Sequence, residues 1–263
     1  FKEIPGSPLA YWVSDAVRAC YENPPLSTTA VIQEGLKTGE NARFIRKWYE
    51  VSHADLNLTG GSDSKWCLHT KGGGFRRWYG NCEDLLLFSN DGEELRAFPK
   101  SSLTGKRNYF KENLSWGRIT SDRVSFRYTP AGSIPNMAGL ALYPHKDNIP
   151  ALLGYLNSPC CDLFLSLTNP TLNFPPGTIA QLPLTLNVDE CGGGDVGKAI
   201  AKAKLDWDAY ERSLDFQSLP LLTASTEPTP TLESSYTAWI TQNKGTIAEM
   251  KRLEEENNRL FID

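Results

Sequence analysis

The chain has 263 residues and a formal net charge of −4, and 40% of its residues are hydrophobic and 22% charged. This composition is typical of globular proteins and disfavours disordered, collagen-like and membrane-spanning classes. The sequence has no apolar run of about 18 residues and no signal-peptide pattern at its start, so we expect a cytoplasmic protein without a membrane partner.

Residues 1–35 are predicted to form a helical lead-in from a preceding domain. Residues 7–21 have the pattern of a short amphipathic helix with Pro8 in its first turn, and Asn23-Pro24-Pro25 ends it. The sequence starts with Phe1 and stops inside an apolar helical pattern, so we expect it to be a piece of a longer protein.

Residues 36–185 are predicted to form a mixed α/β (α+β) domain with a small mixed or antiparallel sheet flanked by helices. Residues 36–47 have the composition of a polar, basic loop. Apolar alternation predicts strands at residues 64–70, 114–119, 124–129 and 137–143, of which the second and third form a hairpin. Pro150 and Pro159 each fit the first turn of a short helix, and residues 179–184 end the compact part.

Residues 186–263 are predicted to be a linker and a helical spacer. An amphipathic helix is expected over residues 198–214, followed by a Ser/Thr/Pro-rich linker over 218–230 and a long helix from Leu232 onward. The apolar residues of this helix recur at spacings of three and four, and Asn257 supplies one polar position in the series. We expect the helix to dock on a neighbouring domain.

Positive charge is concentrated in the middle of the sequence. Residues 65–127 contain 12 Lys and Arg against 7 Asp and Glu, whereas residues 131–263 contain 9 against 16. The basic part is also rich in aromatic residues, a combination that suits nucleic-acid binding. The alternative is that the aromatic side chains fill strand cores and the cations cover the outer faces, and composition alone leaves both open.

Motifs for metal or nucleotide chemistry are incomplete. Residues 192–198 match the spacing of a phosphate-binding loop, but Ala199 stands where a magnesium-binding Ser or Thr is required. Asn23-Pro24-Pro25 resembles the motif with which amino-methyltransferases hold a flipped adenine, yet Leu26 replaces the aromatic residue that stacks on the base. Cys67 and His69 are close enough to suggest a shared zinc, which the absence of a Cys-x-x-Cys pair disfavours. We expect no metal site.

Several long stretches together resemble a known family. They include GLKTGENARFIRKWYEV, KWCLHTKGGGFRRWYGN, RNYFKENLSWGRITSDRVSFRYTPAG, LLGYLNSPCCDLFLSLTNPTLNF and AKLDWDAYERSLDFQSLPLL. In this order they are similar to motifs of the PglX family, the adenine-specific DNA methyltransferases of BREX phage-defence systems. Related stretches occur in type IIG restriction-modification enzymes.

The resemblance implies that residues 36–185 are a target recognition domain. The parent enzyme would transfer a methyl group from S-adenosylmethionine to N6 of adenine, marking host DNA and taking part in phage restriction. This chain lacks the methyl-donor fold, so we expect no catalytic residue and no cofactor within it. The implied partners are double-stranded DNA, the methyltransferase core of the same polypeptide, other defence-system subunits and phage proteins that mimic DNA.

Three basic segments supply the residues expected to contact DNA. Glycines after the strand at 64–70 let a backbone approach phosphate closely, and arginines can fork onto guanine or phosphate. Arginine and asparagine are expected to read bases, and lysine to contact phosphates. The predicted set is Asn41, Arg43, Arg46, Lys71, Gly73, Arg76, Arg77, Tyr79, Lys106, Arg107, Lys111 and Arg118. The alternative is a module that docks on other proteins of the same complex and does not touch DNA.

Overall fold

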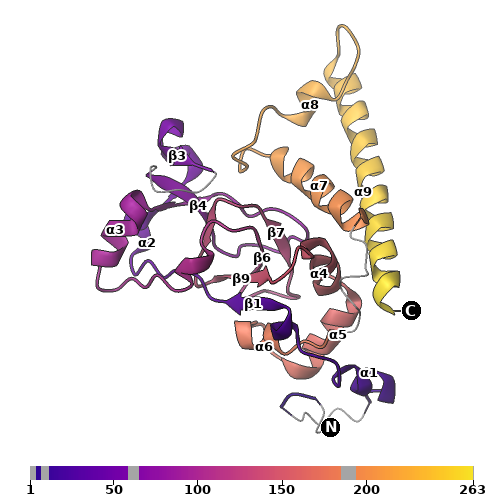
Figure 1. Cartoon of the computed structure of the whole chain (residues 1–263). Coiled ribbons are helices and arrows are strands. Elements are labelled where there is room, and N and C mark those ends of the chain that lie inside the picture. Colours follow the sequence, from indigo (N-terminus) through magenta and orange to yellow (C-terminus); the bar gives the residue numbers. More distant parts are fainter. Residues whose placement is uncertain (1–3, 7–11, 59–64, 185–193, 263) are drawn as a thin grey trace.

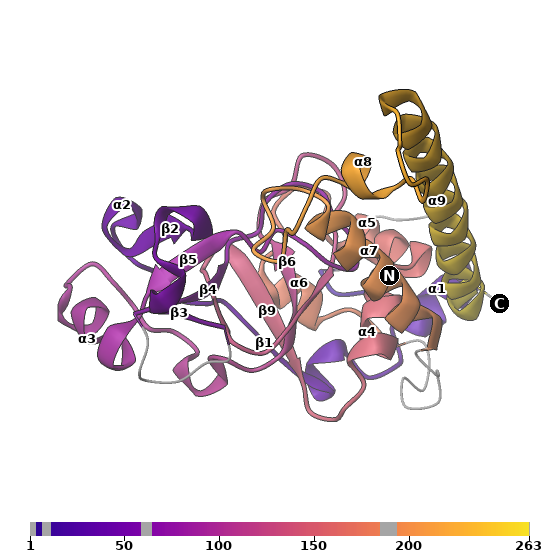
Figure 2. The same ribbon diagram turned by 90° about the horizontal axis from the view of Figure 1, so that it is seen from above.

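The computed structural model describes residues 4–6, 12–58, 65–184 and 194–262. Two small, mostly antiparallel sheets lie next to each other, and helices gather mainly around one of them (Figure 1). The fold class is therefore mixed α/β, as the sequence predicts. Figure 2 shows the short helices α2 and α3 at one end of the molecule and the long helix α9 at the other.

The first sheet is entirely antiparallel and has the strand order β1-β9-β6-β7. Its strands are β1 (Ala30–Gln33), β6 (Asn113–Gly117), β7 (Arg127–Thr129) and β9 (Gly139–Pro144). Leu114 of β6 lies opposite Tyr128 of β7, so the predicted hairpin is confirmed. Trp116 and Leu142 are fully buried under the helices that cover this sheet.

The second sheet has the order β2-β5-β4-β3, and β8 pairs with β4. Its strands are β2 (Ile45–Lys47), β3 (Leu56–Asn57), β4 (Trp66–Thr70), β5 (Asp84–Leu87) and β8 (Ser133–Pro135). The strand predicted over residues 64–70 is confirmed as β4. Only residues 136–138 separate β8 of this sheet from β9 of the first sheet, so the chain passes directly from one sheet to the other.

The loop predicted over residues 36–47 is wrong for its second half. Residues 41–47 form the one-turn helix α2 (Asn41–Phe44) and the strand β2. Phe44 and Ile45 are buried in the core of the second sheet, where Phe44 packs against the ring of Phe98. Burial of these apolar residues outweighs the polar character of their neighbours, since burying such a side chain contributes about 1.5–3 kcal/mol.

Most helices of the described part lie on the first sheet's side of the molecule. They are α1 (Asp15–Cys20), α4 (Ile149–Leu156), α5 (Pro159–Thr168) and α6 (Pro176–Ala180), while α3 (Ser89–Ala97) belongs to the second sheet. Short 3-10 helices are η1 (Leu26–Thr28), η2 (Trp48–Glu50), η3 (His53–Asp55) and η4 (Lys106–Asn108). Pro150 and Pro159 lie in the first turns of α4 and α5, as predicted. Residues 7–11 of the predicted first helix lie outside the described residues.

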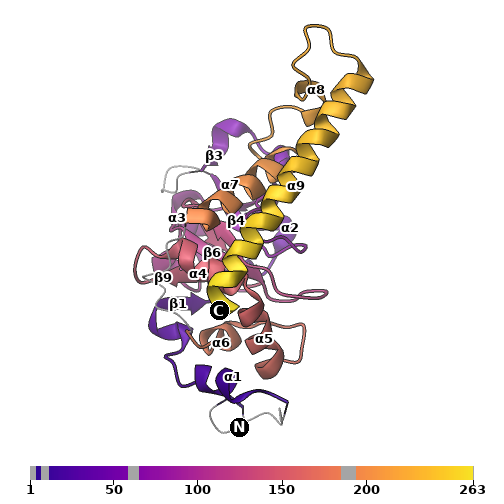
Figure 3. The ribbon, with the colours of Figure 1, turned by 90° about the vertical axis from the view of Figure 1, so that its right-hand side faces the viewer.

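The C-terminal part consists of α7 (Gly194–Asp208), α8 (Pro220–Thr223) and α9 (Leu232–Ile262). The last third of α9 docks on the body, because Leu253 is buried and the Asn257 amide donates a 3.0 Å hydrogen bond to the Gly154 carbonyl. The first half of α9 projects beyond the body together with α8 (Figure 3). None of the helices in the described ranges combines the length and the apolar character that a bilayer crossing requires.

The predicted division at residues 35 and 185 remains a prediction. Strand β1, from the predicted lead-in, is hydrogen-bonded to β9. Helix α7, from the predicted spacer, packs on α4 and α9.

Candidate DNA-binding surface

Two of the three basic segments meet at helix α3. The Arg43 guanidinium of α2 lies 3.2 Å from the Glu94 carboxylate, and Lys106 of η4 forms an ion pair with Asp91. Asp91 has a left-handed backbone conformation, with φ of 58°, at the start of α3. The hydrogen bond from Lys106 holds the pKa of the Asp91 carboxyl below its usual range. Arg43, Glu94 and Lys106 are exposed and Asp91 is half-buried. Helices α2 and α3 lie at the end of the molecule opposite α9 (Figure 2).

The other predicted residues of the first segment lie beside α2. Asn41 is exposed, and its side-chain oxygen accepts a 2.6 Å hydrogen bond from Thr38. Arg46 is half-buried and donates to the carbonyls of Ala42 and Ile45. Asn41 thus keeps its amide nitrogen available for another acceptor, whereas Arg46 is partly used to close the turn.

Arg107 and Lys111 line a groove of about 740 Å³ at the end of β9. His145 and Lys146 approach from the segment after β9, and two carboxylates, Glu112 and Asp147, line the same groove. Lys111 is held by a 3.1 Å hydrogen bond to the Asn108 side-chain oxygen. The groove therefore combines three permanent cations with two anions, a modestly positive site.

Lys71, Gly73 and Arg118 lie where the two sheets meet. Arg118 lies 2.5 Å from the Glu34 carboxylate, and its backbone N–H donates to the Ala138 carbonyl. Gly73 has φ of 101°, a conformation that favours glycine, and it lines a pocket of about 550 Å³. Lys71 is half-buried at the end of β4.

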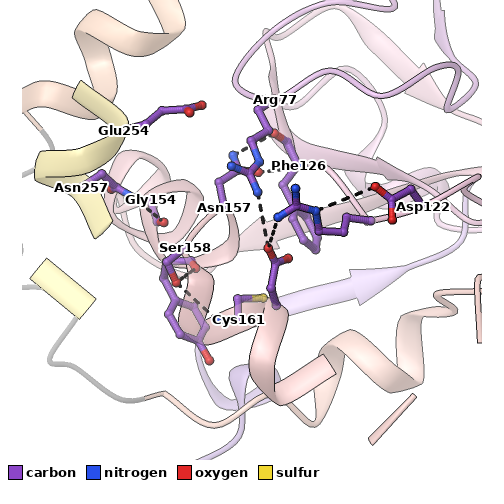
Figure 4. Close-up of polar contacts among 12 residues, drawn as sticks. Arg77, Asp122, Phe126, Gly154, Asn157, Ser158, Cys161, Glu254 and Asn257 are labelled. Carbon is purple, nitrogen blue, oxygen red and sulfur yellow. Dashed lines mark hydrogen bonds and ion pairs between the residues drawn. The ribbon is translucent and has the colours of Figure 1, made fainter. Parts of the chain in front are cut away.

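Arg76 and Arg77 point toward helices. The Arg76 guanidinium is 2.5 Å from the Asp206 carboxylate of α7 and stacks over Trp207 at 5.1 Å. Arg77 lies 3.5 Å from Asp162 of α5 (Figure 4). Both arginines therefore connect the glycine-rich loop to the helices, and a contact with a base would require these ion pairs to break.

Tyr79 is buried in the core of the first sheet, and burial raises the pKa of its hydroxyl. The Lys204 ammonium lies over its ring, 5.4 Å from the ring centre. The preceding residue, Trp78, is also buried, has φ of 72°, and donates a 2.8 Å hydrogen bond from Nε1 to Glu254 of α9. This hydrogen bond connects the loop to α9.

A polar network joins the loop, the hairpin and helices α4 and α5 (Figure 4). The Asn157 side chain donates to the Phe126 carbonyl and accepts from the Phe126 N–H, at 3.0 and 3.1 Å. Asp162 lies 3.5 Å from Arg77 and 3.6 Å from Arg123. Burial raises the pKa of the Asp162 carboxyl despite these two cations, so desolvation is the larger effect here.

The structure thus gathers the predicted residues into separate groups. Arg43 and Lys106 converge at α3, Arg107 and Lys111 share a groove, and Gly73 lines a pocket. Sequence reasoning missed Arg127, a buried arginine that lines the same pocket as Gly73. The alternation of residues 124–129 places Arg127 on the face opposite Val124, Phe126 and Tyr128, and this was the signal that could have found it.

Motifs weighed for metal and nucleotide chemistry have other roles. Both ring nitrogens of buried His69 have protein partners: Nδ1 lies 2.7 Å from the Ile134 carbonyl oxygen, and Nε2 3.0 Å from the Asn136 amide nitrogen. Burial lowers the pKa of His69 to about 4. Leu26, at the position of the stacking aromatic residue in the adenine-holding motif, is fully buried. Residues 192–193 of the phosphate-loop pattern lie outside the described residues. In the parts of the chain that are described, no three His, Cys, Asp or Glu side chains form a metal-binding group.

The described residues do not provide a glycine-rich turn between a strand and a long helix, such as a methyl-donor or nucleotide site uses. Within the described ranges, the strands that lead directly into helices of eight or more residues are β5 and β9. Phe88 forms the first connection and residues 145–148 the second. The second contains no glycine, and the first is followed by Asn90, Asp91 and Gly92, which have left-handed rather than helical dihedral angles.

Comparison with known proteins gives two relatives. The chain is 32% identical over 281 aligned residues, covering its whole length, to the adenine-specific methyltransferase PglX of Lacticaseibacillus casei. It is 36% identical over 229 residues, covering 84% of its length, to the adenine-specific methyltransferase BrxX of Escherichia coli. No protein-family model matches the chain. The chain spans 23% and 18% of these relatives. The resemblance to the PglX family is thereby confirmed, and the chain corresponds to a segment of these adenine-specific methyltransferases.

Proposed function

We propose that this chain is the DNA-reading module of an adenine-N6 DNA methyltransferase that acts in phage defence. The observation that carries the proposal is the match, over the whole chain, to adenine-specific methyltransferases of which it spans less than a quarter. The role proposed for this segment within such an enzyme is recognition of the target, supported by the exposed cations described below. Host DNA marking and phage restriction belong to the whole enzyme and are proposed for it alone.

Two groups of exposed cations support DNA as the partner. Arg43 and Lys106 have exposed carboxylate partners, which a phosphate can replace, since exposed ion pairs contribute only about 0–1 kcal/mol. Arg107 and Lys111 line a groove open to solvent. Binding of DNA to such cations releases condensed counterions, so the affinity must fall steeply with salt.

The experiment is fluorescence anisotropy of the protein with a duplex library at several salt concentrations, followed by sequencing of the bound fraction. We expect a slope of log affinity on log salt of about −0.9 for each phosphate contacted, and an enriched motif that contains adenine. Arg107→Gln together with Lys111→Gln is expected to reduce this slope by about 2. The control is Lys244→Gln, an exposed residue of α9, which is expected to leave the slope unchanged.

A second function, docking on other proteins, is favoured by the projecting half of α9. Tyr236 and Ile247 of this half are more than half exposed, and so is Leu222 of the adjoining α8. We call α8 and the projecting half of α9 the arm. Several exposed apolar side chains on one such segment are typical of a protein interface. The proposed partners of this arm are the methyltransferase core of the same polypeptide or another defence-system subunit. A flat salt response with no enriched motif would favour this function over DNA reading.

A further inference from the structure

Arg127 of β7 is a buried cation without a carboxylate partner. The residue is 3% exposed, and its Nη2 donates a 3.2 Å hydrogen bond to the Gly72 carbonyl. In the described part of the chain, no Asp or Glu lies within ion-pair distance of its guanidinium, and no other hydrogen bond of its side chain is found. Most of its five N–H donors are therefore not used within the protein.

This arrangement differs from that of the neighbouring arginines. Arg76 and Arg77 are more exposed than Arg127, yet each has a carboxylate partner. Burial lowers the pKa of the Arg127 guanidinium to about 10, so the group is still charged at neutral pH. A buried charge without a counter-ion is unfavourable for folding. Its presence is explained if the missing counter-ion is a ligand.

Arg127 lines the pocket of about 550 Å³ that is also lined by the glycine-rich loop. Gly73, Gly74 and Gly117 line part of this pocket and leave that part of its wall without side chains, so a ligand can approach the backbone closely there. The Ser125 hydroxyl accepts a hydrogen bond from the Arg76 N–H and keeps its own proton for an acceptor in the pocket.

Two charged residues stand at the edge of the same pocket. Arg123 is largely exposed and lies 4.0 Å from Asp122 and 3.6 Å from Asp162. The Asp122 side chain is 83% exposed, so it is directed mainly to solvent. The buried part of the pocket is thus positive, while its edge carries both signs.

We propose that this pocket binds one phosphate group of the DNA backbone, with Arg127 as its principal ligand and the Ser125 hydroxyl as a second donor. This rests on the proposed DNA-reading function and adds to it a phosphate site, Arg127, outside the exposed basic segments. A single anchored phosphate would fix the position of the duplex along the surface without reading sequence.

The test uses Gly74, where an added Cβ meets no atom within 4 Å, so that a longer side chain can be accommodated. Gly74→Glu adds a carboxylate to the pocket that Arg127 also lines, and Gly74→Gln adds the same bulk without charge. We expect the Glu variant to bind duplex DNA about tenfold more weakly than the Gln variant at low salt. A third variant, Arg127→Met, is expected to lose one phosphate contact, seen as a decrease of about 0.9 in the salt slope.

Titration calorimetry with inorganic phosphate, at constant ionic strength maintained with chloride, separates the site from the function. We expect the unmodified protein to bind phosphate and the Arg127→Met variant, checked for folding by circular dichroism, to bind it at least tenfold more weakly. Equal phosphate affinity in both proteins would overturn the proposal. So would equal DNA affinity of the Gly74→Glu and Gly74→Gln variants. If phosphate binds through Arg127 but no variant or unmodified protein binds DNA, the DNA-reading function fails and the pocket is an anion site of another kind.

Discussion

The two ends of the molecule hold their cations in different ways. On the side of α5, α7 and α9, arginines reach across to carboxylates far away in the sequence, and the Arg77–Asp162 pair is only about 20% exposed. At the opposite end, Arg43 and Glu94 form a pair that is about half exposed. Pairs of the first kind hold elements together, whereas pairs of the second kind contribute little to stability and can exchange the carboxylate for a phosphate. Basic segments of similar composition therefore differ in what they can bind.

The largest effect is expected from His69. Its buried ring lies in the second sheet, at the same end of the molecule as the exposed ion pairs, so not every polar group at this end is exposed. Its pKa in the folded protein, about 4, lies below the ordinary value of 6.5, so the neutral ring is the folded form. The contribution of the neutral His69 ring to the free energy of unfolding is therefore fully present above pH 6.5. It is lost as the pH falls toward 4, by about 3 kcal/mol in total. Urea unfolding at several pH values measures the loss, and NMR titration of the His69 ring locates the pKa.

The control for that experiment is His69→Gln, in which this pH-dependent component should disappear even if the variant is less stable throughout. A ring titration near pH 6.5, or an unchanged pH dependence in the variant, would contradict the buried neutral imidazole.

Asn157→Ala should have the next largest effect and sharpens the contrast on the helical side. The substitution leaves the Phe126 N–H without a partner in a buried site. The Phe126 carbonyl loses one of its two hydrogen bonds and still accepts from the Trp78 N–H. We expect the free energy of unfolding to decrease by about 2 kcal/mol in urea unfolding.

Asn169→Ala removes two hydrogen bonds at an exposed loop, one to the Asn173 carbonyl and one from the Thr171 hydroxyl, and serves as the control, with an expected loss below about 1 kcal/mol because water can replace both partners. Similar losses of unfolding free energy in the two variants would contradict the expectation that the buried polar contacts contribute more than the exposed ones.

Arg77→Gln tests whether the helix-facing arginines are structural. The 3.5 Å contact to Asp162 is long, and Arg123 remains 3.6 Å from the same carboxylate after the change. We therefore expect a loss of about 1 kcal/mol in stability and little change in DNA sequence preference. A protein of unchanged stability with altered preference for its target duplex would assign Arg77 to base reading instead.

The smallest effect on stability is expected at the exposed end. Arg43→Gln together with Lys106→Gln should change the free energy of unfolding by less than about 1 kcal/mol, because both ion pairs are exposed. The same double variant should reduce the salt slope of DNA binding by about 2. Anisotropy at three or more salt concentrations gives the slope, and a slope equal to that of the unmodified protein would remove α3 and its neighbours from the DNA-binding surface.

Much of the fold could be predicted from the sequence where a local signal agrees with the tertiary structure. The Leu114 and Tyr128 stretches alternate, and they pair as a hairpin. Pro159 follows Ser158, which caps α5 by accepting a hydrogen bond from the Cys161 N–H. The strand β2 was not predicted, because three residues carry too little pattern and its formation depends on pairing with β5.

The candidate site was harder to predict, because whether a basic side chain is available to DNA depends on carboxylate partners that are distant in sequence. Arg76 and its partner Asp206 are 130 residues apart, and no local pattern shows that they meet. Arg127 was overlooked because of its local pattern. An arginine that alternates with aromatic residues in a short strand is expected on the solvent-exposed face of a sheet, and Arg127 is buried instead. Composition identified the basic region, but the helices that pack on it decide which of its cations face solvent.

The direct passage from β8 into β9 has a consequence for cooperativity. Strand β8 is hydrogen-bonded to β4 in one sheet, and three residues later the chain enters β9, which is hydrogen-bonded to both β1 and β6 in the other. Neither sheet can open without pulling on a strand that the other one holds. Amide protons in the centres of both sheets should therefore exchange through one shared global opening, with equal free energies, rather than as two independently unfolding units.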